Sequence, residues 1–429
     1  MKDSELLEAA ATEIEWTPGG MPPQGTPHGV IRPDGSLSFT RRGFVAVSGL
    51  ARSLQQNRVV LRRGSRFESL RKIVANAVLQ QFENRLEEGP TVSKDDLKAV
   101  KERVTDWFDK ASATQTHVVP CAVIPYPGQA FDIGPVRFID AAEFDLANLG
   151  VESHLASETA WETIERQLGE HAARWVAVVE VAGCEGARGA EVADTVVDIA
   201  LAGVQTVFGN DARFMARVTG RSNPAYQGRL AVSENDVSMG VENMEAGRLL
   251  LPETLQTILG ANEELIRSFG NRIRTFLGGA SDLETLEQAW CDGAYWFHQG
   301  FAEPMDTVAV AKLETAMENL LAAASSSGST ERIRTALRVV SGESDREVEE
   351  AQVEFAKRVV EARSRVLHGT RSTTRDDPGV DRASVETVVR RMLAAYSPLL
   401  DSYSQEDGEH VTDDVESFLR WIEQARREL

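Results

Sequence analysis

The chain has little cysteine: only Cys121, Cys184 and Cys291 occur among its 429 residues, and they lie far apart. An odd number of widely spaced cysteines does not predict a disulfide framework, and without a C-x-x-C pair nothing indicates a zinc site. We therefore expect reduced thiols that pack as small hydrophobic side chains. We predict no metal and no other cofactor.

Long apolar runs are also missing. No run approaches the ~20 residues that span a membrane. The acidic segment 1–15 lacks the basic start and the apolar core of a signal peptide. From these two absences we expect a cytoplasmic protein that makes no membrane contact.

Basic residues are outnumbered by acidic ones, 46 to 66, so the net charge is −20. This argues against broad binding to nucleic acid, which needs lysine and arginine for phosphate contacts. One stretch is an exception and contains a single acid, Glu68. Its nine basic residues are Arg41, Arg42, Arg52, Arg58, Arg62, Arg63, Arg66, Arg71 and Lys72. They predict either a local surface for a phosphate backbone or a set of ion pairs with acidic helices.

Length and composition predict an α+β multidomain protein. At about 150 residues per domain, two or three domains are expected, and 42% hydrophobic residues suffice for a sizeable core. We place an N-terminal arm and helical region at 1–115, a mixed α/β module at 116–262 and an all-α helical bundle at 263–429.

The first region begins with the proline- and glycine-rich segment 1–40, which predicts an extended arm outside the core. Two β-prone runs follow, Gly43–Ser48 and Arg58–Leu61. The capping box S65-R-F-E68 then predicts the start of a helix, and a second helix is expected from Ser93 to Lys110.

The middle module alternates β-prone and helical patterns. We expect strands at 116–124, 136–139, 174–181, 213–218, 229–232 and 238–242, and helices at Glu191–Phe208 and Thr254–Leu259. The glycines of G183-C-E-G-A-R-G189 come between a strand and a helix, where backbone amides can bind phosphate. Because Glu185 and Glu191 would repel that anion, we favour a simple turn.

From residue 263 onward the pattern is helical. We predict seven helices, which form a bundle of at least five members. They are expected at Glu263–Leu277, Asp282–Phe301, Met305–Ala324, Glu331–Val340, Arg346–His368, Ala383–Leu400 and Val411–Glu428.

The end of the helix predicted at Arg346–His368 has the most distinctive spacing in the chain. Arg363 comes five positions before His368, and Gly369 follows at once. Glycine can end a helix in a left-handed cap, which places His368 in the last turn. The negative end of the helix dipole favours a protonated ring there, so His368 can act as a proton donor.

R-x4-H followed by glycine, on the last long helix of a bundle, resembles the signature of HEPN domains, and R-S-R-V-L-H-G is similar to the Apea-like HEPN group. Two further runs are similar to helices of that group, A316-M-E-N-L-L321 and E331-R-I-R-T-A-L337. The resemblance covers roughly residues 285–400 and implies an HEPN-like helical bundle at 263–429. It also implies that the mixed α/β module at 116–262 serves target sensing.

The resemblance implies a metal-independent endoribonuclease that works as a homodimer or higher even oligomer, with one composite site. RNA is the expected substrate, in antiphage or stress defence, and a protein or phage-derived trigger is the expected activator. Cleavage needs a stabilised phosphate, a base and an acid. Arg363 would stabilise the phosphate, and two copies of His368 would serve as acid and base. Ser364 matches the family's small polar residue.

Three further residues complete the predicted site. Glu318, in the A-M-E-N-L-L run, is the candidate to orient Arg363, and Arg358 and Arg365 are candidates to bind the RNA backbone.

Other interpretations stay open. An arginine and a histidine at a helix end commonly satisfy only carbonyls and the helix dipole. The alternative function is a non-catalytic HEPN-containing protein that binds or dimerises. Near His298, the aromatic residues Trp290, Tyr295, Trp296 and Phe297 could stack on bases, but their spacing favours the bundle core.

Overall fold

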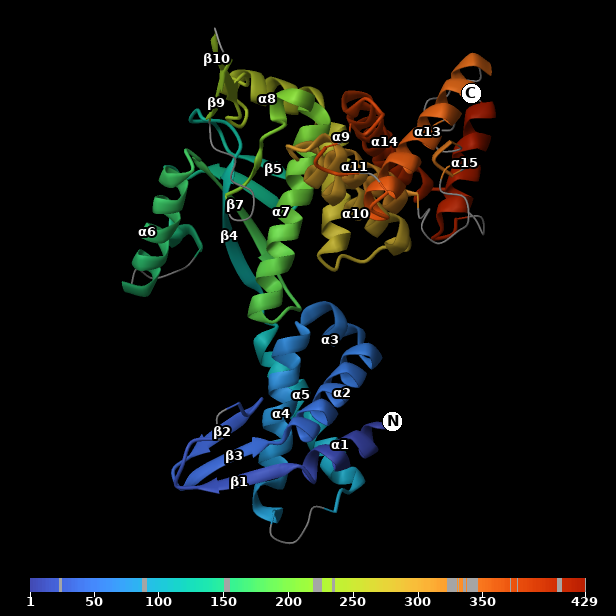
Figure 1. Ribbon diagram of the computed structural model, residues 1–429. Helices are drawn as coiled ribbons and strands as arrows, with labels where there is room; N and C mark the ends of the chain where they lie inside the picture. The colour runs from blue at the N-terminus through green and yellow to red at the C-terminus, as the bar shows by residue number, and fades with distance from the viewer. Residues whose placement is uncertain are drawn as a thin grey trace. The chain divides into compact units, whose positions relative to one another are not determined.

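Figure 1 presents the protein as a computed structural model. It describes residues 1–22, 25–86, 91–149, 155–218, 226–233, 236–321, 330, 332–334, 337, 346–370, 372–375, 377–406 and 411–428. The chain divides into two compact units, Met1–Gln115 with Glu180–Val192 and Thr116–Val179 with Ala193–Leu429. The regions expected at 116–262 and 263–429 thus lie in one unit.

The first unit combines a small sheet with a helical core. It starts with α1 (Asp3–Ala11) and an antiparallel sheet of order β1-β3-β2. The strands are β1 (Ile14–Pro18), β2 (Gly29–Arg32) and β3 (Gly35–Phe39). The helices that follow are α2 (Arg41–Asn57), α3 (Val59–Gly64), α4 (Phe67–Phe82) and α5 (Lys94–Ala111), with a 3-10 turn at Glu83–Arg85.

The prediction of an extended arm at 1–40 is wrong. Leu7, Leu37 and Phe39 are fully or almost fully buried in the core of the first unit. The glycines of this segment instead allow strands to approach closely: a Cβ on Gly35 would lie 2.5 Å from the carbonyl oxygen of Thr17. Such a residue belongs to a tight sheet rather than to a loose arm.

The two β-prone runs are also predicted wrongly, because they form α2 and α3. In α2 the buried residues recur at the spacing of a helix: Gly43, Ala46, Val47, Leu50, Ala51 and Leu54. Burial on one helical face therefore overrides the local β propensity. The helix at 67–82 is confirmed, but its N-cap is Arg66, and Ser65 instead donates to Leu61.

The second unit contains a five-stranded sheet of order β5-β6-β7-β4-β8. Its strands are β4 (Gln115–Ala122), β5 (Phe131–Ile133), β6 (Val136–Asp140), β7 (Trp175–Val181) and β8 (Ala216–Arg217). The predicted strands at 116–124, 136–139 and 174–181 are confirmed. Helix α6 (Leu155–Glu170) was not predicted, and 3-10 turns lie at Leu146–Leu149 and Gly209–Ala212.

Helix α7 (Gly186–Phe208) lies between this sheet and the helical region. A Cβ on Gly203 would be 3.1 Å from Phe269 and 3.7 Å from Ile133 of β5. By length and composition the segment Gly186–Ala212 could cross a membrane, but 78% of its apolar window is buried inside the protein. Such burial is typical of a helix that lies in the core of a protein.

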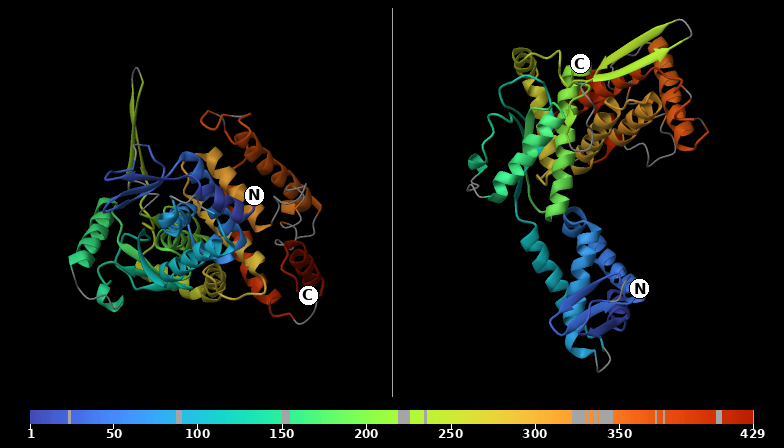
Figure 2. Two further views of the ribbon diagram at one scale, coloured as in Figure 1. Left: turned by 90° about the horizontal axis from the view of Figure 1, so that it is seen from below. Right: turned by 60° about the vertical axis from the view of Figure 1, so that its left-hand side comes forward.

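A two-stranded hairpin, β9 (Tyr226–Val232) and β10 (Val237–Asn243), extends away from the rest of the second unit (Figure 2). Its polar residues Arg229 and Glu242 border a groove of about 600 Å³, whose opposite side includes Asp306 and Arg382.

The C-terminal region is helical. Its helices are α8 (Pro252–Ala261), α9 (Glu263–Phe276), α10 (Glu284–Phe301), α11 (Asp306–Leu320), α13 (Arg346–Leu367), α14 (Arg382–Tyr403) and α15 (Val415–Glu428). Helix α10 packs against α9, α11 and α14, and α13 packs against α11. Six of the seven predicted helices occur close to their predicted bounds. The seventh, at 331–340, falls mostly outside the described residues.

Candidate functional site

The R-x4-H segment forms the C-terminal end of α13. Gly369 has φ of +64°, the left-handed conformation that glycine adopts without a Cβ penalty. Its N–H donates to Val366, and the N–H of Thr370 donates to Arg365. This hydrogen-bond pattern is a Schellman motif, so the predicted glycine cap is confirmed. His368 is exposed directly after the last helical residue, Leu367.

Arg363 contacts two carboxyl groups of α11. Its Nη2 lies 2.9 Å from Oε2 of Glu318, and its Nε lies 3.3 Å from Oε2 of Glu314. Both glutamates are buried, whereas the arginine side chain is 30% exposed. Glu314 and Glu318 are one helical turn apart, so both side chains are presented on one face of α11. The two contacts fix the guanidinium, while the side chain of Arg363 remains partly exposed.

The carboxyl groups of Glu314 and Glu318 lie so close together that the charge of one opposes ionisation of the other. Burial, together with the neighbouring Glu318, raises the pKa of Glu314 to about 8, although Arg363 acts in the opposite direction. Glu314 therefore holds its proton at neutral pH, and the shorter contact of Arg363 is the one with Glu318.

The other predicted site residues lie along the same helix. Ser364 is half-buried next to Arg363. Arg358 pairs with Glu354 at 2.8 Å, and Arg365 pairs with Glu361 at 3.1 Å. Both pairs are exposed and join residues four positions apart, so solvent and salt screen them and they hold the arginines only weakly. Either arginine can exchange its carboxylate for a phosphate at little cost.

The R-x4-H motif of one chain supplies one arginine, Arg363, and one histidine, His368. That is enough to bind a phosphate and to move one proton, but an RNA cleavage step needs both an acid and a base. The remaining group would have to come from a second copy of the chain or from solvent.

A second polar cluster, inside the second unit, was not predicted. Nε2 of His298, on α10, lies 3.3 Å from Asp198 on α7, and Arg217 of β8 hydrogen-bonds the same carboxylate at 2.8 Å. The side chain of His298 is fully buried. Gln205 donates to the carbonyls of Ala212 and Met215, which leaves its oxygen 2.9 Å from Nδ1 of His298.

Both ring nitrogens of His298 therefore face acceptors, an arrangement that favours the doubly protonated ring. Burial would raise the pKa of Asp198, but the charge of His298 and the bonds from His298 and Arg217 hold that pKa well below its usual range. The sequence hinted at this cluster only through two aspartates, Asp194 and Asp198, in the otherwise mostly apolar run A193-D-T-V-V-D-I-A-L201. We interpret the cluster as a structural link between α7, α10 and β8.

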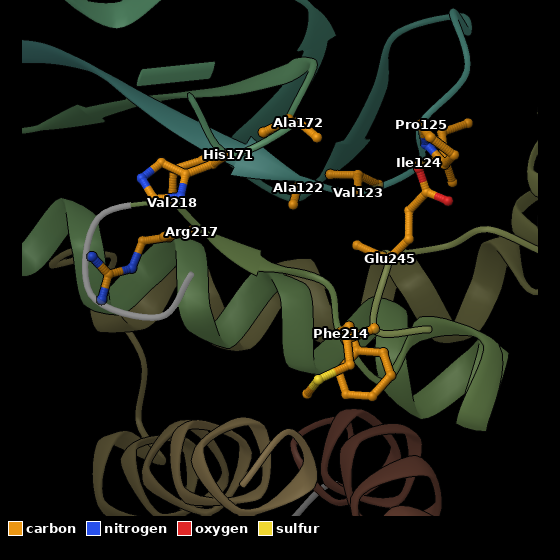
Figure 3. A pocket seen from close by; sticks show the side chains of 13 residues that line it. Ala122, Val123, Ile124, Pro125, His171, Ala172, Phe214, Arg217, Val218 and Glu245 are labelled. Carbon is orange, nitrogen blue, oxygen red and sulfur yellow. The ribbon is translucent and has the colours of Figure 1, made fainter. Parts of the chain in front are cut away.

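Beside this cluster lies a small pocket of about 30 Å³, with room for about one or two water molecules (Figure 3). Arg217 and His171 line one end and Glu245 lies toward the other. The side chain of Arg217 also pairs with Asp194 at 2.8 Å. Since the carboxylates of Asp194 and Asp198 hold the guanidinium, the pocket is a poor candidate for an anion site.

The glycine turn before α7 is a simple turn, as favoured from the sequence. The carboxylate of Glu185 accepts hydrogen bonds from the backbone N–H groups of Arg66 and Ala187, and this side chain is buried. The helix start is thus capped by the protein's own carboxylate instead of a phosphate.

The aromatic residues near His298 are divided between core and surface. Trp290 and Phe297 are fully buried, which confirms the interpretation as bundle core for these two. Tyr295 and Trp296 are only half-buried.

In comparisons with protein-family models, curated proteins and solved structures, no match to this chain was found.

Proposed function

We propose that this protein is a metal-independent endoribonuclease of HEPN type, whose composite site forms when two copies of the end of α13 face each other. The observation that carries the proposal is the contact of Arg363 with Glu318. These residues come from two of the segments that resemble the Apea-like HEPN group, and their side chains meet although they lie 45 positions apart along the chain.

In the proposed reaction, the 2′-hydroxyl of a ribose attacks the adjacent phosphate and the 5′-oxygen of the next nucleotide leaves. His368 of one copy takes the proton from the 2′-hydroxyl, and His368 of the other copy gives a proton to the leaving oxygen. The products are a 2′,3′-cyclic phosphate and a free 5′-hydroxyl.

Arg363 stabilises the negative charge that grows on the phosphate in the transition state. The hydrogen-bond donors of a planar guanidinium suit this task, and the ion pair with Glu318 keeps them in place. Arg358 and Arg365, both exposed on α13, would bind the RNA backbone next to the scissile bond. Ser364 supports the site as a small polar neighbour of Arg363.

The same geometry is compatible with the alternative, a non-catalytic protein that binds or dimerises. An arginine held by two carboxyl groups of α11 also connects α11 to α13, and a structural ion pair needs no substrate.

Cleavage in the presence of EDTA separates the two functions. The wild-type protein should release fragments that end in a cyclic phosphate, and His368→Ala and Arg363→Ala should each lower the rate by at least about a hundredfold. His171→Ala is the matched control, because it removes another exposed histidine of the same unit. Cleavage by folded His368→Ala protein at the wild-type rate would refute the assignment.

A further inference from the structure

The basic stretch 41–72 lies in the first unit, away in sequence from the candidate site on α13. Its arginines do not all pair with carboxylates. Arg66 pairs with Glu191 at 2.7 Å, but Arg41, Arg42, Arg52, Arg62 and Arg71 have no carboxylate within ion-pair distance in the part of the chain that the structure describes. Ion pairing, one of the two interpretations of this stretch, therefore does not account for most of it.

Two of these arginines are held by aromatic rings. The guanidinium of Arg71, on α4, lies 4.9 Å from the ring centre of Phe44 on α2 and 5.6 Å from that of Phe67. Arg52 lies 5.3 Å above Phe67. His28 stacks on Phe44, with ring centres 6.2 Å apart and planes 14° from parallel. We call His28, Phe44, Arg71, Phe67 and Arg52 the arginine–phenylalanine stack.

Stacking has a different consequence from ion pairing. A carboxylate fixes an arginine and neutralises it, whereas a ring fixes the guanidinium plane and leaves its charge and its N–H donors available. Nε of Arg71 is buried and donates no hydrogen bond to any described residue, so no carboxylate neutralises this donor. The side chain as a whole is half-buried, and a buried donor without an acceptor lowers stability.

The surroundings of the stack are basic as well. At 100° per residue, Arg41, Phe44, Ser48 and Arg52 lie in one stripe of α2. Arg41 and Arg42 are exposed in the first turn of this helix, which contains no acid. Cations at a helix N-terminus oppose the helix dipole, so their position costs some stability.

We infer that the arginine–phenylalanine stack binds the phosphate backbone of single-stranded RNA, independently of the site on α13. The guanidinium groups of Arg52 and Arg71 would contact phosphates, and bases would stack on the exposed guanidinium plane of Arg52, as in other single-strand binding surfaces. The choice of RNA over another polyanion rests on the proposed function, whereas the choice of a phosphate chain rests on the stack itself.

The test is fluorescence anisotropy of a labelled uridine oligonucleotide of about 20 nucleotides, longer than the ~4–16 that one binding module covers. The full chain carries His368→Ala in every sample, so that cleavage does not interfere. Arg52→Ala combined with Arg71→Gln should weaken binding at least about tenfold. The slope of log K against log salt should also become shallower, by roughly 0.7 for each phosphate that the variant no longer neutralises.

Arg267→Ala is the matched control, because it removes one exposed arginine of the second unit and should leave the affinity unchanged. Arg52→Ala alone is the second variant, since Arg52 is exposed and its loss leaves the core of the first unit intact. Equal affinity of the double variant and the parent would overturn the inference, as would the absence of RNA binding by the parent. Equally tight binding of polyglutamate would overturn the assignment to nucleic acid.

These outcomes are distinct from those of the cleavage test. RNA binding that depends on Arg52 and Arg71 in a protein that never cleaves would refute the nuclease and keep the stack as an RNA-binding surface. If the Arg52→Ala, Arg71→Gln variant still cleaves RNA and binds it with unchanged affinity, the stack is refuted as an RNA-binding surface and the nuclease is kept.

Discussion

Nη2 of Arg363 and Oε2 of Glu318 lie 2.9 Å apart, in an ion pair that joins α13 to α11. The carboxylate is buried and the arginine is partly exposed, so the pair presents a fixed guanidinium at the surface beside the end of α13. The proposed function depends on this relationship, because a mobile arginine would lose entropy each time it met a phosphate.

If Glu318 positions Arg363, then Glu318→Gln should lower RNA cleavage by about ten- to a hundredfold, less than Arg363→Ala does. A glutamine at this position keeps a hydrogen-bond acceptor but loses the charge. The measurement is the rate at saturating RNA together with KM, because a positioning residue should alter mainly the rate. Unchanged cleavage by a folded variant would show that Arg363 needs no such partner.

Glu314 predicts a dependence of stability on pH. Its pKa is about 8 in the folded protein and near 4.5 in the unfolded chain, so the folded state holds this proton more tightly. Its contribution to stability is fully present below about pH 4.5 and is lost as the pH rises to about 8. At ~1.4 kcal/mol per pKa unit, the loss amounts to a few kcal/mol at most.

Glu314→Gln should therefore gain stability relative to the wild type between pH 5 and pH 8, as measured by urea unfolding at both values. Glu264→Gln, which removes an exposed carboxyl, is the control. Parallel pH profiles of the wild type and Glu314→Gln would contradict the buried, protonated carboxyl.

The left-handed conformation of Gly369 at the end of α13 predicts that an alanine at this position lowers the stability of the helix end. Gly369→Ala should cost about 1 kcal/mol, because φ of +64° is unfavourable for a residue with a Cβ, although no neighbouring atom lies within 4 Å. If His368 takes part in cleavage, the rate should fall as well. Gly260→Ala is the matched control, since this residue of α8 also has no neighbour within 4 Å but has no positive φ, and alanine should stabilise the helix slightly.

The buried cluster of Asp198 and His298 predicts a large effect on stability. Asp198→Asn should lower the free energy of unfolding by about 3–5 kcal/mol, because it leaves the charges of His298 and Arg217 without their carboxylate. The low pKa of Asp198 means that its contribution is present above about pH 4 and is lost in more acidic solution. The deficit of the variant should therefore shrink on acidification. Asp132→Asn, from an exposed pair, should change stability by less than about 1 kcal/mol.

Much of the helical region could be predicted from the sequence because its apolar residues recur at helical spacing and breakers separate the runs. The first 64 residues could not. The β-branched and aromatic residues of G43-F-V-A-V-S48 favour a strand locally, and only burial against the rest of the first unit makes the segment helical. Helix α6 was missed entirely.

The candidate site was predictable to the extent that it is local. The glycine cap depends only on neighbouring residues and was predicted. Glu318 was identified because the run A316-M-E-N-L-L321 resembles a helix of the HEPN group. Glu314 was missed, although its position one turn before Glu318 places it on the same face. The buried polar cluster joins residues from distant parts of the chain, His298, Asp198 and Arg217. No local pattern therefore predicts their contact.

The most direct test of the composite site is RNA cleavage by mixed oligomers, made by co-expressing wild-type and His368→Ala chains in known proportions. If both copies of His368 act in one site, an equal mixture should retain about a quarter of the wild-type activity, since only pairs of wild-type chains are complete. If each chain acts alone, about half of the activity should remain. A linear fall with the fraction of His368→Ala chains would contradict the composite site, and no fall at all would remove His368 from the reaction.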